Sequence, residues 1–433
     1  MVKRVLKTTS VVILSLALLS VFGFFIQQKT NALIPDGPLK EFVMFPQTVM
    51  DVFQSNEIRN IPPTFEMRHF FDPINNLRQD IFGLNAFYNP DEGTWEVRLF
   101  NFKDDSVAHT WKLNRSTFNQ TDRLYPNSEP RNPILLPNRN VIVDNDETFN
   151  LYRLDAESNI VWHNTELIFH HSMNLDHDGN IWVCTTEPRL IKVPTDEHPV
   201  AYEDDYLTKV DVETGSVIYH KSTSELLIEN GYRNFVYGFS HVIDGALDED
   251  PLHLNDIEPV LNDGPYWKKG DVFLSFRHRS LVLLYRPSSN KIIRLIYGPF
   301  LRQHDIDILN DSTISIFNNE GTSVGKKLKQ DHELFDHPPA DVIDFSNIMH
   351  YHFADSSFSH HLKHQFDEHH IFTDTQGFHQ YLSNGMVYVE QHGRGIMYFM
   401  DENQVYYKNQ GSNWVRDFVE RPHWVRIYEN VDL

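Results

Sequence analysis

From about residue 80 onward, short apolar runs alternate with polar turns along the chain. Residues 134–143, for example, contain one apolar run, a polar turn and a second apolar run. Short apolar runs bounded by Asn, Asp, Gly and Pro predict β-strands joined by tight turns. The frequent Tyr, Phe and Thr residues also favour strands.

The predicted strands recur in units. Each unit is a turn, a strand, a second strand ending in a polar turn, and a third strand, over roughly 40–60 residues. The clear units include residues 134–163, 180–220, 271–295 and 382–407, and two weaker ones include residues 83–100 and 313–352. Each unit exposes an apolar face that only a neighbouring unit can bury, so the pattern predicts an all-β, six-bladed β-propeller.

Two other all-β folds fit the pattern less well. A β-helix would show shorter repeats, and a β-sandwich would not repeat hairpins at this period. Residues 424–428 form a last apolar run. We expect this run to close the ring of blades as an extra strand.

The N-terminal part of the chain has a different pattern. Lys3, Arg4 and Lys7 precede an apolar run over residues 11–26. This predicts a signal peptide or an uncleaved membrane anchor within residues 1–32, with the body of the protein in the periplasm or otherwise outside the cytoplasm. Residues 33–80 show helix-like spacing interrupted by prolines and are expected to form a partly helical lead-in. The propeller is then expected over residues 81–433.

The charge balance limits the partners. The chain has 38 Lys and Arg against 60 Asp and Glu, a formal net charge of −22. Nucleic acid is therefore excluded as a partner, because binding its phosphates needs a basic surface. A small anionic substrate is still compatible, since a local basic cluster can lie inside an acidic shell. The single cysteine, Cys184, permits no intrachain disulfide and is expected to be a buried, inert thiol.

Three histidines stand in similar sequence contexts. His171, His253 and His304 are each followed four residues later by Leu or Ile, and then by an apolar strand. For His253 that strand comes after an insertion over residues 261–269, and Arg277 ends it. If these are the inner strands of successive blades, the three histidines and Arg277 converge on the propeller axis.

Such a cluster suits a tetrahedral anion, and an imidazole can act as nucleophile or proton shuttle near neutral pH. Two alternatives stay open at this point. A histidine before a strand is often an ordinary turn residue, and three histidines can bind zinc, although a nearby arginine disfavours a cation. A second histidine group, within residues 360–370, is expected to be a solvated loop.

Several segments resemble the bacterial arylsulfotransferase family, which acts without a nucleotide donor. The resemblance covers roughly residues 130–410, and its most specific parts are residues 270–278, 295–299, 303–305, 314–319, 375–385 and 393–395. It implies a six-bladed propeller and the transfer of a sulfuryl group from an aryl sulfate to a phenol. It implies neither a cofactor nor a metal.

The resemblance also implies roles for individual residues. His304 would be the nucleophile that is transiently sulfated, and His171 would carry the proton. His253 and Arg277 would neutralise the sulfuryl oxygens, and His170 would replace His171 if the first motif is shifted by one residue. Phe276 and Asn318 depart from the family pattern, which expects a small residue and an acid there. The rival interpretation is an exported, non-catalytic propeller that binds a ligand or a protein.

Overall fold

The computed structural model describes residues 65–67, 71–89, 94–113, 130–191, 200–238, 250–321, 345–410, 414–415 and 418–431. The predicted export segment, residues 1–32, lies outside these residues, as does most of the predicted lead-in, and both stay predictions. Within the described ranges, no helix is long and apolar enough to cross a membrane.

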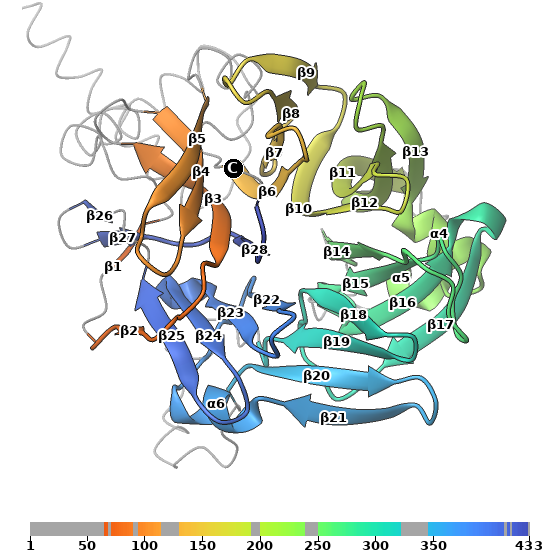
Figure 1. Cartoon of the computed structure of the whole chain (residues 1–433). Coiled ribbons are helices and arrows are strands. Elements are labelled where there is room, and N and C mark those ends of the chain that lie inside the picture. The colour runs from red at the N-terminus through yellow and green to blue at the C-terminus, as the bar shows by residue number, and fades with distance from the viewer. Residues whose placement is uncertain are drawn as a thin grey trace, which may run out of the picture. The chain divides into compact units, whose positions relative to one another are not determined.

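Six antiparallel sheets form a ring, so the predicted six-bladed β-propeller is confirmed (Figure 1). Blade 1 consists of β28 (Arg426–Tyr428), β3 (Phe82–Asn89), β4 (Thr94–Asn101) and β5 (Val107–Leu113). Blade 2 consists of β6 (Pro130–Leu135), β7 (Val141–Asn145), β8 (Leu151–Leu154) and β9 (Ile160–Asn164). Blade 3 consists of β10 (Ile168–Leu175), β11 (Ile181–Ile191), β12 (Val200–Val210) and β13 (Val217–Ser222).

The other three blades follow the same plan. Blade 4 consists of β14 (Leu254–Pro259), β15 (Val272–Phe276), β16 (Leu281–Arg286) and β17 (Lys291–Tyr297). Blade 5 consists of β18 (Ile306–Asn310), β19 (Thr313–Asn318), β20 (Asn347–His352) and β21 (Ser357–His361). Blade 6 consists of β22 (Phe378–Tyr381), β23 (Val387–Gln391), β24 (Ile396–Met400), β25 (Val405–Gln410) and β2 (Ile74–Asn75).

A few elements lie outside the blades. A three-stranded sheet contains β1 (Phe65–Met67), β27 (Phe418–Glu420) and β26 (Trp414–Val415). The helices are α4 (Thr223–Glu229), α5 (Arg233–Tyr237) and α6 (Lys363–Glu368), and the 3-10 turns are η1 (Arg277–Arg279), η2 (Pro287–Ser289) and η5 (His392–Arg394).

The ring is closed by strands from both ends of the described chain. β28 pairs with β3, with Arg426 opposite Leu84, which confirms the predicted closing strand. β2 pairs with β25, with Ile74 opposite Lys408. β2 lies within the predicted lead-in, so this part of the segment is a strand of blade 6.

The histidine-bearing segments are themselves the inner strands. β10, β14 and β18 lie nearest the axis, and the apolar strands β11, β15 and β19 are second strands (Figure 1). The prediction that the apolar strands are innermost is therefore wrong. Second strands are buried on both faces and read as apolar, whereas the inner strands also carry buried polar residues such as Asn255 and Asp256 on β14. Residues 261–269 connect β14 to β15 and do not separate His253 from its own strand.

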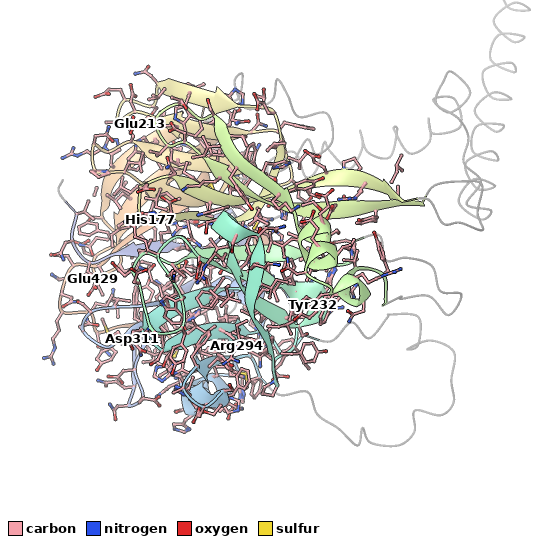
Figure 2. All side chains as sticks on the ribbon, turned by 90° about the vertical axis from the view of Figure 1, so that its right-hand side faces the viewer. His177, Glu213, Tyr232, Arg294, Asp311 and Glu429 are labelled. Atoms are coloured by element: carbon pink, nitrogen blue, oxygen red, sulfur yellow. The ribbon has the colours of Figure 1, made fainter. Side chains whose placement is uncertain are left out.

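The two faces of the ring follow from this order. Turns after the inner strands carry His177, Asp311 and Glu429, and these residues lie along one edge of the side view (Figure 2). The N-terminal heads of the inner strands therefore lie toward the opposite face.

The apolar core lies between neighbouring blades. Leu274 on β15 packs with residues of blade 3, whereas the preceding residue, Phe273, packs with residues of blade 5. Both side chains are fully buried. Alternation along the strand sends successive side chains to opposite faces, and each such side chain contributes about 1.5–3 kcal/mol.

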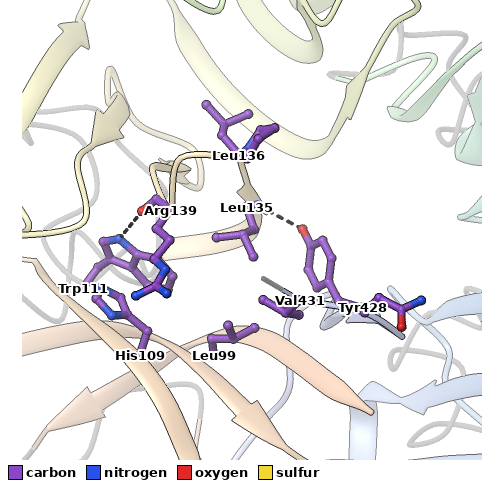
Figure 3. A pocket seen from close by; sticks show the side chains of 10 residues that line it. Leu99, His109, Trp111, Leu135, Leu136, Arg139, Tyr428 and Val431 are labelled. Atoms are coloured by element: carbon purple, nitrogen blue, oxygen red, sulfur yellow. Dashed lines mark hydrogen bonds between the residues drawn. The ribbon is translucent and has the colours of Figure 1, made fainter. Parts of the chain in front are cut away.

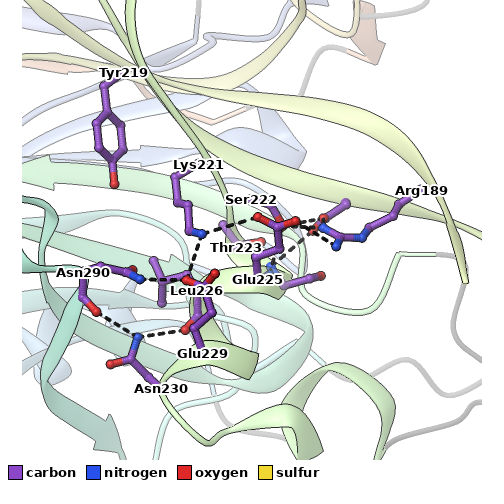
Figure 4. A network of polar contacts seen from close by, with 12 residues as sticks. Arg189, Tyr219, Lys221, Ser222, Thr223, Glu225, Leu226, Glu229, Asn230 and Asn290 are labelled. Atoms are coloured by element: carbon purple, nitrogen blue, oxygen red, sulfur yellow. Dashed lines mark hydrogen bonds and ion pairs between the residues drawn. The ribbon is translucent and has the colours of Figure 1, made fainter.

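Polar contacts fasten α4 to blade 4 (Figure 4). The Ser222 hydroxyl accepts the Glu225 N–H at 3.0 Å, which is the first half of a capping box. Glu225 also accepts from Arg189 at 3.0 Å, and Glu229 accepts from the blade 4 residue Asn290 at 2.7 Å.

The second histidine group is ordered, so the prediction of a solvated loop is wrong. Its residues lie on β21 and around α6. The ring of His361 stacks on His350, with centroids 4.8 Å apart, and on Tyr381 at 5.6 Å. The many histidines make this segment read as polar. Imidazoles can nevertheless stack as aromatic rings, so the segment forms a packed strand.

Buried side chains also join each blade to the next inner strand. The acceptors are carboxylates at five junctions: Asp146 for the His171 N–H (3.2 Å), Asp205 for Leu254 (2.6 Å), Asp256 for Ile306 (2.9 Å), Asp305 for His379 (2.8 Å) and Glu390 for Trp424 and Val425 (3.1 and 3.0 Å). All five are at most 5% exposed. Between blades 1 and 2 the Tyr428 hydroxyl accepts the Leu135 N–H at 3.0 Å.

We predict that Glu390→Ala destabilises the protein by roughly 2–5 kcal/mol, because two buried N–H groups at the ring closure lose their acceptor. Urea unfolding measures this change. Glu157→Ala, at an exposed turn residue, is the control and should change the free energy of unfolding by less than about 0.5 kcal/mol. Equal losses in the two variants would contradict the role of Glu390.

Candidate functional site

Six residues with a left-handed backbone stand at the heads of the six inner strands. They are Asn132 (φ 47°), His171 (φ 57°), His253 (φ 56°), Arg302 (φ 55°), Gln376 (φ 58°) and Trp424 (φ 55°). Positive φ costs a residue other than glycine about 1–3 kcal/mol and clusters at functional sites. In blades 2, 3 and 4 the strand register also breaks near this residue. Such bulges re-aim side chains, here at one mouth of the propeller.

A small cavity lies among these heads. Its lining residues are Arg131, Asn132, His171, His304, Gln376 and Trp424. They come from blades 1, 2, 3, 5 and 6. Two of the three predicted histidines therefore share one cavity, and the third, His253, contacts His171.

His304 is held as a neutral imidazole. Its Nδ1 lies 2.8 Å from Asn319 Oδ1, and its Nε2 accepts the Gln376 N–H at 2.9 Å. An amide oxygen only accepts, so Nδ1 carries the hydrogen and Nε2 carries the lone pair. Burial, and then the positive charge of Arg277, lower the pKa of His304 well below its ordinary value. A lone pair at Nε2 is what a nucleophile needs.

His171 and His253 form a proton-sharing pair. Their Nε2 atoms lie 3.0 Å apart, and His253 Nδ1 lies 2.5 Å from Asp250 Oδ2. A carboxylate accepts, so His253 Nδ1 carries a hydrogen and a single proton lies between the two Nε2 atoms. Burial lowers the pKa of His171 well below its ordinary value, and the neighbouring His253 lowers it further. The chain from Asp250 to His171 can therefore pass a proton into the cavity.

Arg277 approaches this group from blade 4. It begins η1, directly after β15, and its side chain is 8% exposed. Its guanidinium contacts His278 Nε2 at 3.1 Å, and its Nε has no hydrogen-bond partner among the described residues. Burial, with the like charge of Arg302, lowers the pKa of Arg277 to about 10, so it keeps its charge at neutral pH.

His170, the fallback for His171, points elsewhere. Its Nε2 lies 3.3 Å from Asp205 Oδ1, and it does not line the cavity. Burial disfavours its charged form, but the hydrogen bond and charge of Asp205 outweigh burial and raise the pKa of His170 to about 9. His170 is therefore a buried cation that pairs with Asp205 next to the site and does not face the cavity.

The similar sequence contexts of the three histidines predict equivalent positions in their blades. This prediction is correct for two of the histidines. His171 and His253 are the left-handed residues of their strands, whereas in blade 5 that residue is Arg302, two positions before His304. His304 therefore lies deeper along its strand. Spacing to the next Leu or Ile cannot detect a shift that a bulge introduces.

Other residues of the site were not predicted from the sequence, because the pattern that marks the site consists of histidines. Asn132, Gln376 and Trp424 line the cavity, and Asp250 orients His253. One signal was present. Asn132 is followed four residues later by Leu136, as His171 is followed by Leu175 in the next unit.

One group of potential metal ligands lies next to the site. Asp250, His253 and His278 place ligand atoms within 4.8 Å of one another. However, His278 Nε2 accepts from Arg277, so its Nδ1 carries a hydrogen and donates to the Asp250 carbonyl at 2.7 Å. A protonated Nδ1 and an adjacent guanidinium both oppose a cation here. Zinc binding by the three predicted histidines would likewise require His304 Nε2 to release the Gln376 N–H.

A larger pocket of about 240 Å³ lies at the other ends of β6 and β28 (Figure 3). Leu99, Leu135 and Val431 form part of its apolar lining. Its one histidine, His109, is committed to the Ala156 carbonyl at 2.8 Å. The smaller cavity is therefore the candidate active site, because it is lined by His171 and His304, although the other pocket is larger.

A comparison with known protein families names a family. The family model described as arylsulfotransferase (ASST) matches residues 132–410. No curated protein matches.

Solved structures that are similar to this chain are distant in sequence. A protein of unknown function from Bacteroides caccae is 11% identical, covers 76% of this chain and 93% of its own, and has a TM-score of 0.44. A functionally unknown protein from Desulfotomaculum acetoxidans is 8% identical over 80% of this chain and 98% of its own, with a TM-score of 0.41. Virginiamycin B lyase from Staphylococcus aureus is 7% identical over 66% and 71%, with a TM-score of 0.36. Likenesses at these levels carry no inference about activity.

The His170–Asp205 pair predicts a pH dependence of stability. The pKa of His170 is raised above its unfolded value, so its stabilisation is complete below about pH 6.5 and is lost as the pH rises through about 9. Asp205→Asn keeps the acceptor for Leu254 but removes the charge. The difference in free energy of unfolding between wild type and variant, measured in urea, should shrink by on the order of 2–3 kcal/mol over this range. A difference independent of pH would contradict the assignment.

Proposed function

Because the chain belongs to the arylsulfotransferase family, we propose that it transfers a sulfuryl group from an aryl sulfate to a phenol through a sulfated His304. The observation that carries the proposal is the neutral His304, with its Nε2 lone pair at a cavity that His171 also lines. Neither half of the reaction calls for a nucleotide donor.

In the first half-reaction, His304 Nε2 attacks the sulfur of the aryl sulfate. The N–S bond forms as the S–O bond to the ring breaks, and the phenolate leaves. A proton from His171 Nδ1 neutralises the phenolate, and His171 Nε2 takes up a replacement proton from His253 across the 3.0 Å contact. His304 Nδ1–H continues to donate to Asn319 Oδ1, so the sulfated imidazole is stabilised as it gains charge.

In the second half-reaction, an acceptor phenol gives its proton to His171. The phenol oxygen then bonds to sulfur while the N–S bond breaks, which restores neutral His304. Arg277 and His253 are proposed to stabilise the negative charge on the sulfuryl oxygens in both steps, because fixed charges in a dry site act strongly on a transition state. Asp250 keeps His253 oriented for this task.

One contact must change when the substrate binds. His304 Nε2 accepts the Gln376 N–H in the present structure, and a lone pair cannot also attack sulfur. Gln376 is a left-handed residue directly before Gly377, whose φ is 99°. We propose that this turn shifts when the donor enters, which also enlarges the small cavity.

We predict that His304→Ala abolishes transfer from 4-nitrophenyl sulfate to a phenol while the protein stays folded by circular dichroism. His364→Ala, at a side chain that is 78% exposed, is the matched control and should keep activity. Incubating wild type with the donor alone should add the mass of one SO₃ group to the peptide that contains His304. Unchanged transfer by His304→Ala, or a folded wild type without added mass, would favour the non-catalytic binding propeller instead.

A second prediction concerns Arg277. Its positive charge helps to hold the pKa of His304 low, so Arg277→Gln should raise that pKa and move the acid limb of kcat/KM to higher pH. The maximal rate should also fall about 100-fold or more, because a stabilising charge is lost from the transition state. The readout is a pH–rate profile with 4-nitrophenyl sulfate, with Arg78→Gln at an exposed site as control. An acid limb that does not move would refute the electrostatic coupling.

A further inference from the structure

Asn132 is a buried amide without partners at the reactive cavity. Its side chain is 1% exposed, and neither Nδ2 nor Oδ1 has a hydrogen-bond partner among the described residues. Asn132 lines the cavity together with His171 and His304. Leaving such a buried polar group unsatisfied costs about 1–3 kcal/mol.

The backbone of Asn132 adds to this cost. Its φ is 47°, in a region where glycine would be free of strain. By contrast, the nearby amide of Asn319 is fully used, because it contacts His304 at Oδ1 and donates to the Thr373 carbonyl at 2.9 Å. Asn132 combines an unsatisfied buried amide with an unfavourable backbone conformation, and it lies next to the proposed nucleophile. This combination indicates that Asn132 binds a ligand that is absent here.

The polar groups around Asn132 are largely committed. Arg131 pairs with Asp146 at 2.5 Å, and His171 Nε2 is taken by His253. His171 Nδ1 also has no hydrogen-bond partner in the described part of the chain, and it lies 3.9 Å from Asp146 Oδ1. Asn132 therefore offers a ligand a neutral amide from blade 2, two blades away from the charged Arg277 of blade 4.

We propose that the Nδ2 group of Asn132 donates a hydrogen bond to a sulfuryl oxygen of the substrate. A sulfuryl group has three oxygens, which one guanidinium and one imidazole on blade 4 cannot surround. An amide from blade 2 completes the set of donors without adding charge that would deactivate neighbouring neutral imidazoles. This inference rests on the proposed function and assigns a binding group to a residue that no histidine motif includes.

Two variants separate a binding role from a structural one. Asn132→Gly removes the amide and suits the left-handed backbone. Asn132→Asp keeps the shape and introduces a charge that repels an anion. The matched control is Asn290→Gly, which makes the same exchange at a left-handed Asn on the outer part of blade 4 (φ 52°).

The probe for binding is 4-nitrobenzenesulfonate, whose sulfonate group cannot be transferred because its C–S bond is not cleaved. Its dissociation constant is measured by calorimetry. The affinity of Asn132→Gly should fall about tenfold or more, equivalent to about 1.4 kcal/mol, and that of Asn132→Asp further. The uncharged 4-methylphenol should bind wild type and both variants within about threefold. The kcat/KM for 4-nitrophenyl sulfate should fall at least as much as the sulfonate affinity, and Asn290→Gly should match wild type.

Each outcome decides the inference. Equal sulfonate affinity of wild type and Asn132→Gly, or no binding by wild type, overturns it. An equal loss of 4-methylphenol and sulfonate affinity also overturns it, because disruption of the cavity weakens both ligands. Suppose that wild type transfers no sulfuryl group, and that the Asn132 variants bind the sulfonate more weakly than wild type does but bind 4-methylphenol equally well. The proposed function then fails, while the role of Asn132 in binding stands.

Discussion

The propeller depends on buried acceptors at the blade junctions. An inner strand has a neighbour in its own sheet on one side only, so the N–H groups at its head need a partner from the preceding blade. Asp146, Asp205, Asp256, Asp305 and Glu390 supply these partners, and Tyr428 supplies the sixth. Apolar packing presses the blades together, whereas these directional bonds fix the height and rotation of each inner strand.

The same carboxylates also shape the site. Asp205 holds the head of β14 and raises the pKa of His170, while Asp146 holds the His171 N–H and pairs with Arg131. A change that loosens a junction would therefore also change the charge of a histidine neighbour. Fold and chemistry are coupled because both use carboxylates at the same heads of strands.

Backbone strain is present at each of these heads. One left-handed residue stands at the head of the inner strand in every blade, and bulges break the register of β6, β10 and β14. The ring of blades tolerates this strain because its large interblade core exceeds the cost of a few unfavourable dihedrals. The strain places His171, Asn132 and Gln376 around His304, and an unbulged strand would turn alternate side chains into the blades.

The sequence by itself determined the propeller, the number of blades and the closing strand. Each follows from local patterns, namely apolar runs, turn residues and a repeat that only neighbouring units can bury. It also singled out His171, His253, His304 and Arg277, because reactive side chains are visible at any position. Only the tertiary structure decided which strands are innermost, the offset of His304, the dyad of Asp250 with His253, and the place of Asn132. Those features depend on bulges and on contacts between residues far apart in the chain, such as Gln376 N–H with His304, which no local pattern encodes.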